Sequence, residues 1–259
     1  MATRPLILLT NDDGIAAPGL QALVEVARDL GDIIIVAPDS PQSGQGHAIT
    51  LEDPLRLKPV DIFDGVEAYE CTGTPVDCVK LAKHVVARGR TIGFCASGIN
   101  HGSNAGVNVI YSGTMSAAME ASLEGITSVG FSLLDYRWEA NFEVAKPYVR
   151  EIIEQGLAGA FGEATLLNVN IPNGREHPIQ GVRVCRQADA RWIEEFQEGT
   201  DPRGQTYYWL TGRFVPNDVV EGTDIHALDR HYVSVVPCMH DLTQHTALAA
   251  LRTLESQPA

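Results

Sequence analysis

The sequence predicts an α/β protein with a Rossmann-like, doubly wound and mostly parallel sheet, followed by a C-terminal extension of β-hairpins and a helix. Short, continuously apolar runs, which are typical of strands buried on both faces, alternate along the chain with segments of helical periodicity. Two adjacent carboxylates, Asp12 and Asp13, directly follow the first of these runs. Open α/β sheets bind their ligands at this end of a strand.

The first elements are the clearest. Leu6–Thr10 is expected to be a buried strand, and residues 18–30 form a helix with an apolar face of leucine, valine and alanine. Thr74-Pro75 predicts a helix start because threonine is a good N-cap and proline fits the first turn. Between these helices we expect a strand at 32–37 and a hairpin within 51–69, and after the second helix a strand at 92–96.

The following segments continue the alternation. A long loop rich in glycine and asparagine, residues 97–106, is expected after the strand at 92–96, and Ser112-Gly113-Thr114 precedes a helix with Met115 and Met119 on one side. Further elements are expected as strands at 126–134 and 165–171, with a helix from about 142 to 157 between them.

The pattern changes after about Ile179. Residues 180–236 are richer in short extended pieces, and residues 242–254 are expected to form a terminal helix. We therefore divide the chain into a Rossmann-like catalytic core at residues 1–179 and an extension at residues 180–259. The extension is expected to pack on the core and on a partner subunit, because hairpins outside a sheet core often mediate oligomerisation.

Composition limits the possible partners. The net charge of −14 argues against indiscriminate binding to nucleic acid or to an anionic membrane. No apolar run is long enough to span a membrane, and the amino terminus does not read as a signal peptide. Five cysteines, an odd number without C-x-x-C spacing, favour reduced thiols in a cytoplasmic protein.

Several loops converge if the strands are parallel. The first loop carries Asp12 and Asp13, the second carries Ser43, and the third carries Asn100 and Asn104. Two adjacent carboxylates repel each other unless a cation lies between them. Carboxylate, hydroxyl and amide oxygens suit magnesium, manganese or calcium better than zinc. The sequence thus predicts a site for one hard divalent ion per subunit, with water and a phosphate group as further ligands.

A phosphate seat is expected beside this ion. Ser112, Gly113 and Thr114 at a helix start offer backbone N–H groups and hydroxyls to phosphate oxygens. Each of these sequence motifs also has a purely structural interpretation. Asp12-Asp13-Gly14 is compatible with a plain turn and helix cap, and Ser112 and Thr114 with an ordinary N-cap. The shared position of these residues at one sheet edge favours the functional interpretation.

Several short motifs occur in one order along nearly the whole chain. They are Leu8-Leu9-Thr10-Asn11-Asp12-Asp13-Gly14-Ile15, Ser43-Gly44, Gly73-Thr74-Pro75-Val76-Asp77, Ser97-Gly98-Ile99-Asn100, Tyr111-Ser112-Gly113-Thr114, Leu167-Asn168-Val169-Asn170-Ile171-Pro172 and Gly222-Thr223-Asp224. With these motifs in the family's order, the chain resembles the SurE family of stationary-phase survival proteins, which are metal-dependent nucleotidases.

This resemblance implies a Rossmann-like core and a divalent ion held by Asp12, Asp13, Ser43 and Asn100. It implies hydrolysis of nucleoside 5′-monophosphates, with 3′-monophosphates and polyphosphate as further substrates, and assembly into homodimers or homotetramers through the C-terminal extension. Gly46, Ala48 and His231 depart from the usual pattern. These departures put loop geometry and nucleotide preference in doubt but remove no metal ligand.

The expected catalytic residues are Asp12, Asp13 and Asn11, and the expected phosphate-binding residues are Asn104, Ser112, Gly113 and Thr114. One of the aspartates would orient or deprotonate the attacking water, and the sequence does not say which. His47 and His101 are candidate proton donors, although solvated loop histidines are the more common case.

Two other functions remain as alternatives to an ion-dependent phosphatase. A nucleotide-binding sensor would hold the same ligand without turnover. A Rossmann dehydrogenase is disfavoured because no G-x-G-x-x-G follows the first strand. The adjacency of Asp12 and Asp13, in place of D-x-D spacing, favours attack by water over a phosphoaspartate intermediate.

Overall fold

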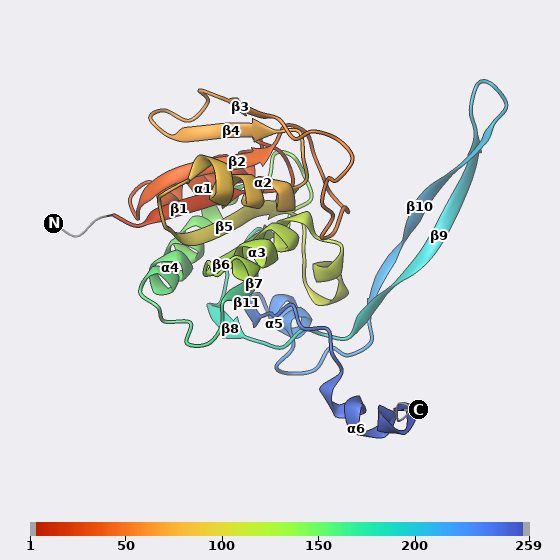
Figure 1. The fold of residues 1–259 in the computed structure, drawn as a ribbon. Coiled ribbons are helices and arrows are strands. Elements are labelled where there is room, and N and C mark those ends of the chain that lie inside the picture. Colours follow the sequence, from red (N-terminus) through yellow and green to blue (C-terminus); the bar gives the residue numbers. More distant parts are fainter. Residues whose placement is uncertain (1–3, 256–259) are drawn as a thin grey trace.

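A nine-stranded sheet forms the centre of the molecule, as the computed structural model of residues 4–255 shows (Figure 1). Its strand order is β3-β4-β2-β1-β5-β6-β7-β11-β8. The strands from β4 to β7 run parallel, whereas β3 and β11 pair antiparallel to β4 and β7. The strands are β1 Leu6–Thr10, β2 Asp32–Pro38, β3 Leu57–Pro59, β4 Glu67–Cys71, β5 Ile92–His101, β6 Ser128–Leu133, β7 Leu166–Ile171, β8 Val182–Val184 and β11 Val233–Pro237.

Helices cover both faces of the sheet, so the predicted doubly wound α/β fold is confirmed. On one face α1 (Pro18–Ala27) and α4 (Lys146–Leu157) pack against each other and on β5. On the other face α2 (Pro75–Leu81) packs on α3 (Gly113–Leu123). Each face has its own buried apolar cluster. The remaining helical segments are η1 Ala82–Val86, η2 Gly106–Ile110, η3 Phe142–Val144, α5 Asp224–Asp229, η4 His245–Ala247, α6 Leu248–Leu251 and η5 Arg252–Leu254.

The helix start at Thr74 follows from its side chain. Thr74 Oγ1 accepts the backbone N–H of Asp77 at 3.2 Å, and the Asp77 carboxylate accepts the backbone N–H of Thr74 at 2.9 Å. This reciprocal pair is a capping box, with Pro75 at the first helical position. Asp77 also accepts the Thr50 hydroxyl at 2.6 Å, which ties the loop after β2 to this helix.

Three elements differ from the expectation. Strand β5 runs to His101 instead of ending at Ala96, because Asn100 and His101 pair with Ser132 and Leu133 of β6. The first helix ends at Ala27, and the expected terminal helix is a series of short turns with only four residues of α-helix. The short helix α5 had no counterpart in the sequence-based prediction.

The expected boundary near Ile179 falls inside the sheet, since β8 and β11 are its last two strands. Helix α5 also packs on the sheet, against β11, whereas one part of the extension leaves the body. Strands β9 (Ala190–Thr200) and β10 (Thr206–Pro216) form a separate two-stranded antiparallel hairpin that projects away from the sheet (Figure 1).

All five cysteines are free thiols. Among residues 4–255, no helix combines the length and apolar character needed to cross a membrane.

Candidate active site

Asp12 lies immediately after β1 and is almost fully buried. Thr114 Oγ1, in the first turn of α3, donates a hydrogen bond of 2.5 Å to Asp12 Oδ1. A Cβ on Gly113 would lie 2.6 Å from Asp12 Cβ and 2.8 Å from Asp12 Oδ2, so only glycine lets the start of α3 approach this closely. Burial and the neighbouring charge of Asp13 raise the pKa of Asp12 from 3.8 to about 6. The site therefore holds a carboxylate whose charge is not compensated by the protein.

Asp13 contacts the end of β5. Its Oδ2 accepts the backbone N–H of His101 at 3.3 Å and lies 3.1 Å from His101 Nδ1. His101 is largely buried, and hydrogen bonding to Asp13 raises the pKa of its imidazole against the opposing effect of burial. The view of His101 as a solvated loop residue is thus wrong.

Asn100 belongs to β5 and faces the same edge. Its Nδ2 donates to the carbonyl oxygens of His101 and Gly102 at 3.1 and 3.0 Å. These two bonds fix the amide orientation and leave Oδ1 as the acceptor, which is the atom that a cation would need.

Ser43 lies in the exposed loop after β2. Two backbone hydrogen bonds hold this loop against the site: Gln42 N donates to the Asp12 carbonyl at 2.8 Å, and Gly46 N donates to the Tyr111 carbonyl at 3.2 Å. The loop thereby connects the end of β1 with the segment that leads into α3.

Asn11 shapes the turn itself. Its Nδ2 donates to the Gly14 carbonyl at 2.9 Å, while its buried Oδ1 has no hydrogen-bond partner within the described residues. Gly14 has a φ of 102°, a conformation that favours glycine. A buried acceptor without a donor is a candidate contact for a water or a cation.

The expected phosphate residues have partners of their own. Ser112 Oγ accepts the backbone N–H of Met115 at 3.1 Å and is the N-cap of α3, and the Thr114 hydroxyl is committed to Asp12. Asn104 Nδ2 donates to Ser132 Oγ at 2.8 Å. What remains for an anion is the first backbone N–H groups of α3, which Gly113 brings close to Asp12.

Sequence reasoning missed a charged cluster behind the Ser43 loop. Glu120 of α3 is buried, accepts a hydrogen bond from Lys80 of α2 through Oε1, and has Oε2 2.9 Å from His47 Nε2. His47 is therefore an anchor of the loop rather than a free side chain. The sequence feature that could have indicated this cluster is that Glu120 is the single charged residue of α3.

A second set of residues missed from the sequence supports Asn104. Asn170 Oδ1 accepts the Asn104 backbone N–H at 2.8 Å, and Asn168 Nδ2 donates to the Asn104 carbonyl at 2.9 Å. Asn170 Nδ2 in turn donates to Asn168 Oδ1 at 2.9 Å. These alternate residues of β7 lie on one face of the strand and hold the loop in place.

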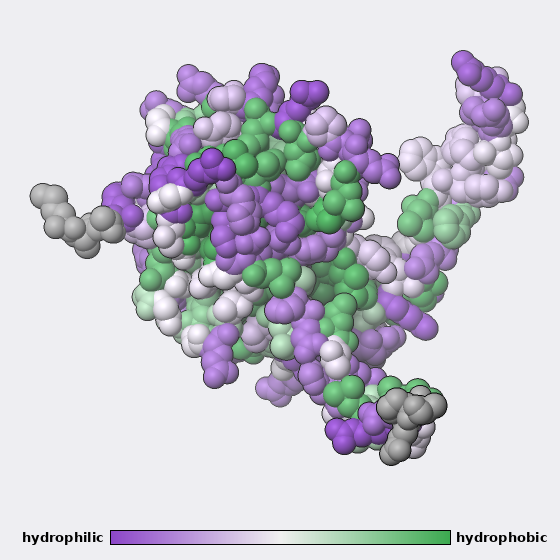
Figure 2. All heavy atoms as spheres, in the orientation of Figure 1, coloured by the Kyte–Doolittle hydropathy of each residue, from purple (hydrophilic) through white to green (hydrophobic). Residues whose placement is uncertain are grey.

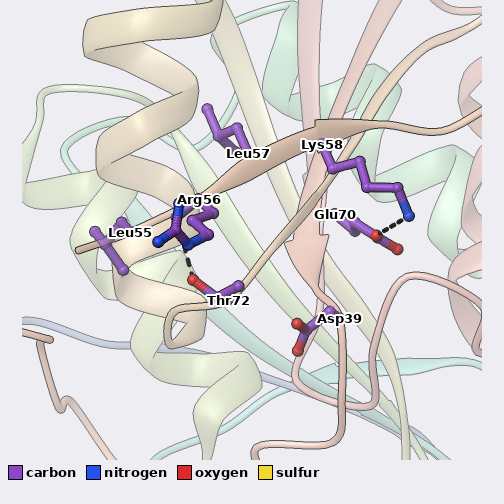
Figure 3. Close-up of a pocket in the computed structure, with 7 residues that line it drawn as sticks. All are labelled: Asp39, Leu55, Arg56, Leu57, Lys58, Glu70 and Thr72. Atoms are coloured by element: carbon purple, nitrogen blue, oxygen red, sulfur yellow. Dashed lines mark hydrogen bonds and ion pairs between the residues drawn. The ribbon is translucent and has the colours of Figure 1, made fainter. Parts of the chain in front are cut away.

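A separate open pocket of about 510 Å³ lies at the β3–β4 edge (Figure 3). Lys58 pairs there with Glu70 at 2.8 Å, and Arg56 lies beside Thr72. Asp39 at the end of β2 also lines this pocket, but neither Asp12 nor Asp13 does. The pocket is therefore distinct from the carboxylate site.

The donor atoms at the carboxylate site are all oxygens. Within residues 4–255, no three His, Cys, Asp or Glu residues gather in a metal-binding arrangement. In the same range no lysine or arginine forms an ion pair with Asp12 or Asp13. A cation at this site would consequently depend on the Asp12–Asp13 pair together with neutral oxygens such as those of Ser43 and Asn100, a set that suits a hard ion.

Comparison with known proteins identifies the family of this chain. The family model described as "Survival protein SurE" matches residues 7–194. A protein of Cytophaga hutchinsonii named 5'-nucleotidase SurE is 52% identical over 249 residues, which cover 96% of each chain. A protein of the same name from Christiangramia forsetii is 54% identical over 244 residues, covering 93% of this chain and 94% of that one.

Comparison with solved structures points to the same family. The crystal structure of the SurE protein from Aquifex aeolicus is 38% identical and superposes with a TM-score of 0.82, covering 97% of this chain and all of that one. With matches of this extent in sequence and structure, the chain belongs to the survival protein SurE family.

Proposed function

We propose that this chain hydrolyses nucleoside 5′-monophosphates to a nucleoside and phosphate, with a divalent cation at the Asp12–Asp13 pair. The curated relatives are named 5'-nucleotidase SurE, and the chain is a hydrolase of phosphoric monoesters of that type. The observation that carries the proposal is the buried Asp12, whose pKa is raised to about 6 beside Asp13 and beside the start of a helix. Such a pair is costly in the cation-free fold and useful when a cation and a phosphate meet there.

The expected cation ligands are Asp12, Asp13, Ser43 and Asn100. The fixed amide of Asn100, which leaves Oδ1 free to accept, supports this set. Magnesium, manganese and calcium all fit these oxygens. When bound, a divalent cation neutralises phosphate charge and activates water for attack on phosphorus.

Other residues of the site position the carboxylates and bind the phosphate. Thr114 donates a hydrogen bond to one oxygen of Asp12, and the absence of a side chain at Gly113 lets the start of α3 lie close to the other. The backbone N–H groups at the start of α3 would hold equatorial phosphate oxygens as charge builds in the transition state. His101 fixes Asp13, and Asn11 shapes the turn that presents both carboxylates.

The test is phosphate release from adenosine 5′-monophosphate with manganese, with EDTA as the control. Turnover that EDTA abolishes and manganese restores supports the proposal. A nucleotide-binding sensor would bind the nucleotide with no release of phosphate, and that result would overturn it. A panel with a 3′-monophosphate and polyphosphate then defines the substrate range.

We also infer that the protein is a homodimer or homotetramer assembled through the extension. The hairpin β9–β10 exposes Phe196, Trp209 and Leu210 by 65 to 68%, and Figure 2 shows an apolar patch partway along this projecting arm, whose tip is hydrophilic. An isolated two-stranded hairpin is marginally stable in water, so a second subunit is the natural cover for it. The cytoplasmic location stays a prediction from the sequence.

A further inference from the structure

Two aromatic side chains stand exposed beside the carboxylate site, on the segment that follows β6. Tyr136 is 77% exposed and Trp138 is 61% exposed. Large exposed aromatic rings next to a catalytic edge are candidates for ligand contact, because they combine a wide apolar face with little loss of conformational freedom on binding.

Trp138 is linked to Asp13 through His101. Its ring lies parallel to the His101 imidazole, at an interplanar angle of 4° and a centroid distance of 5.6 Å. His101 in turn contacts Asp13 through Nδ1 at 3.1 Å. The indole thus lies one ring beyond the carboxylate pair, within the span of a nucleotide whose phosphate is at that pair.

Tyr136 extends the same wall over Gly102. A Cβ on Gly102 would lie 2.2 Å from Tyr136 Cε1, so the ring rests directly on the backbone at the end of β5. The Tyr136 hydroxyl accepts the backbone N–H of Ser103 at 3.4 Å. The two rings therefore flank the end of β5 from one side.

The segment that carries both rings is anchored rather than loose. The buried Asp135 accepts Arg137 Nε at 2.8 Å and lies 3.5 Å from Arg175 Nε. Asn173 Nδ2 donates to the Leu134 carbonyl at 3.1 Å. A platform fixed in this way costs little ordering free energy when a ligand binds.

From this arrangement we propose that Trp138, with Tyr136 beside it, is the stacking platform for the nucleobase, an inference that rests on the proposed nucleotidase function. The indole lies parallel to the His101 ring, and most of the residue is exposed to solvent. Stacking on it distinguishes a nucleotide from a simple phosphate ester, because every base has a π-face. It also favours purines, which cover more of an indole than pyrimidines do.

The test compares adenosine 5′-monophosphate with ribose 5-phosphate, which lacks only the base. Trp138→Ala is expected to lower kcat/KM for the nucleotide by roughly tenfold to a hundredfold and to leave ribose 5-phosphate nearly unchanged. Uridine 5′-monophosphate should lose less than the adenine nucleotide. Trp138→Phe, which keeps an aromatic face, should retain most of the activity. Val85→Ala, an exposed apolar residue of η1 just before β5 begins, is the control.

The outcomes separate the platform from the proposed function. An equal loss of kcat/KM with both substrates would mean that the Trp138 ring acts only through His101. No loss with either substrate would mean that the ring contributes nothing to the reaction. Either result would refute the stacking proposal. If the unaltered protein releases no phosphate, equilibrium dialysis with the adenine nucleotide tests whether Trp138 binds the base. Binding that Trp138→Ala weakens about tenfold keeps the platform and rejects turnover, whereas binding unaffected by Trp138→Ala, or absent altogether, rejects the platform as well.

Discussion

Replacing Asp12 with asparagine is expected to make the cation-free protein more stable while abolishing phosphate release. The Asp12 side chain is buried, accepts one hydrogen bond from Thr114 and is next to a second carboxylate. Asparagine has nearly the same shape and can still accept the Thr114 hydroxyl through Oδ1. The change removes the buried charge and, with it, the strongest expected cation ligand.

The magnitude follows from the pKa of Asp12. Its value rises from 3.8 to about 6 in the fold, and each pKa unit corresponds to about 1.4 kcal/mol, so ionising Asp12 in the native state costs about 3 kcal/mol. The unfolded chain loses this proton at lower pH than the folded one. The destabilisation is therefore absent below pH 3.8, grows as pH rises, and is complete above about pH 6.

Urea denaturation of the cation-free protein at neutral pH and at pH 4 measures this difference. Asp12→Asn should exceed the unaltered protein by up to about 3 kcal/mol at neutral pH and by little at pH 4. Asp39→Asn, which removes an exposed charge at the end of β2, should stay within roughly 0.5 kcal/mol. Added manganese should stabilise the unaltered protein and not the Asp12 variant. Full phosphate release by Asp12→Asn, or a large loss of its stability at neutral pH, would refute the reasoning.

Three further changes test the site and its support. Gly113→Ala places a Cβ 2.6 Å from Asp12 Cβ, so Asp12 or the start of α3 must shift; kcat/KM should fall by at least about tenfold and stability by roughly 1–3 kcal/mol, and normal activity would contradict the close approach of α3. Gly19→Ala places a Cβ 1.9 Å from the Ile99 carbonyl oxygen and should cost roughly 1–3 kcal/mol in urea denaturation. Gly93→Ala, with its nearest neighbour at 3.7 Å, is the control, and equal losses in the two would reject the packing argument. Deleting residues 190–216 should lower the number of subunits per particle, obtained by dividing the mass from light scattering by the chain mass, and an unchanged number would rule the hairpin out as the assembly element.

The central strands were predictable because their apolar runs are continuous and bounded by turns. Strand β1 has the bounds that the sequence indicates, and the end of β2 differs by one residue. The polar end of β5 was not predictable, because Asn100 is held in the strand by pairing with Ser132 of β6, far away in the sequence. A local pattern contains no information about such pairing.

The candidate site was likewise predictable from the sequence only in part. The predicted parallel topology was enough to place Asp12, Asp13 and Asn100 at one edge of the sheet. It did not predict which group each hydroxyl at the start of α3 would hydrogen-bond. Thr114 contacts Asp12, whereas Ser112 caps the helix, although both stand at the same helix start. The distinction depends on the way Gly113 packs against Asp12, which only the tertiary structure shows.

The extension also supports the segment that leads into the proposed phosphate seat. The buried Asp224 of α5 accepts the backbone N–H of Gly106 at 2.8 Å, and Trp192 of β9 donates to Asn108 Oδ1 at 2.8 Å. On the other side the same segment is held by Asn170 of β7. Residues 103–110 thus lie between the core and the extension, and they run directly into α3. Because both sides fix this segment, we expect the sheet edge and the extension to act as one unit in binding phosphate. The change in composition near Ile179 then marks a change in local sequence pattern within one folded body, and catalysis should depend on residues from both sides of it.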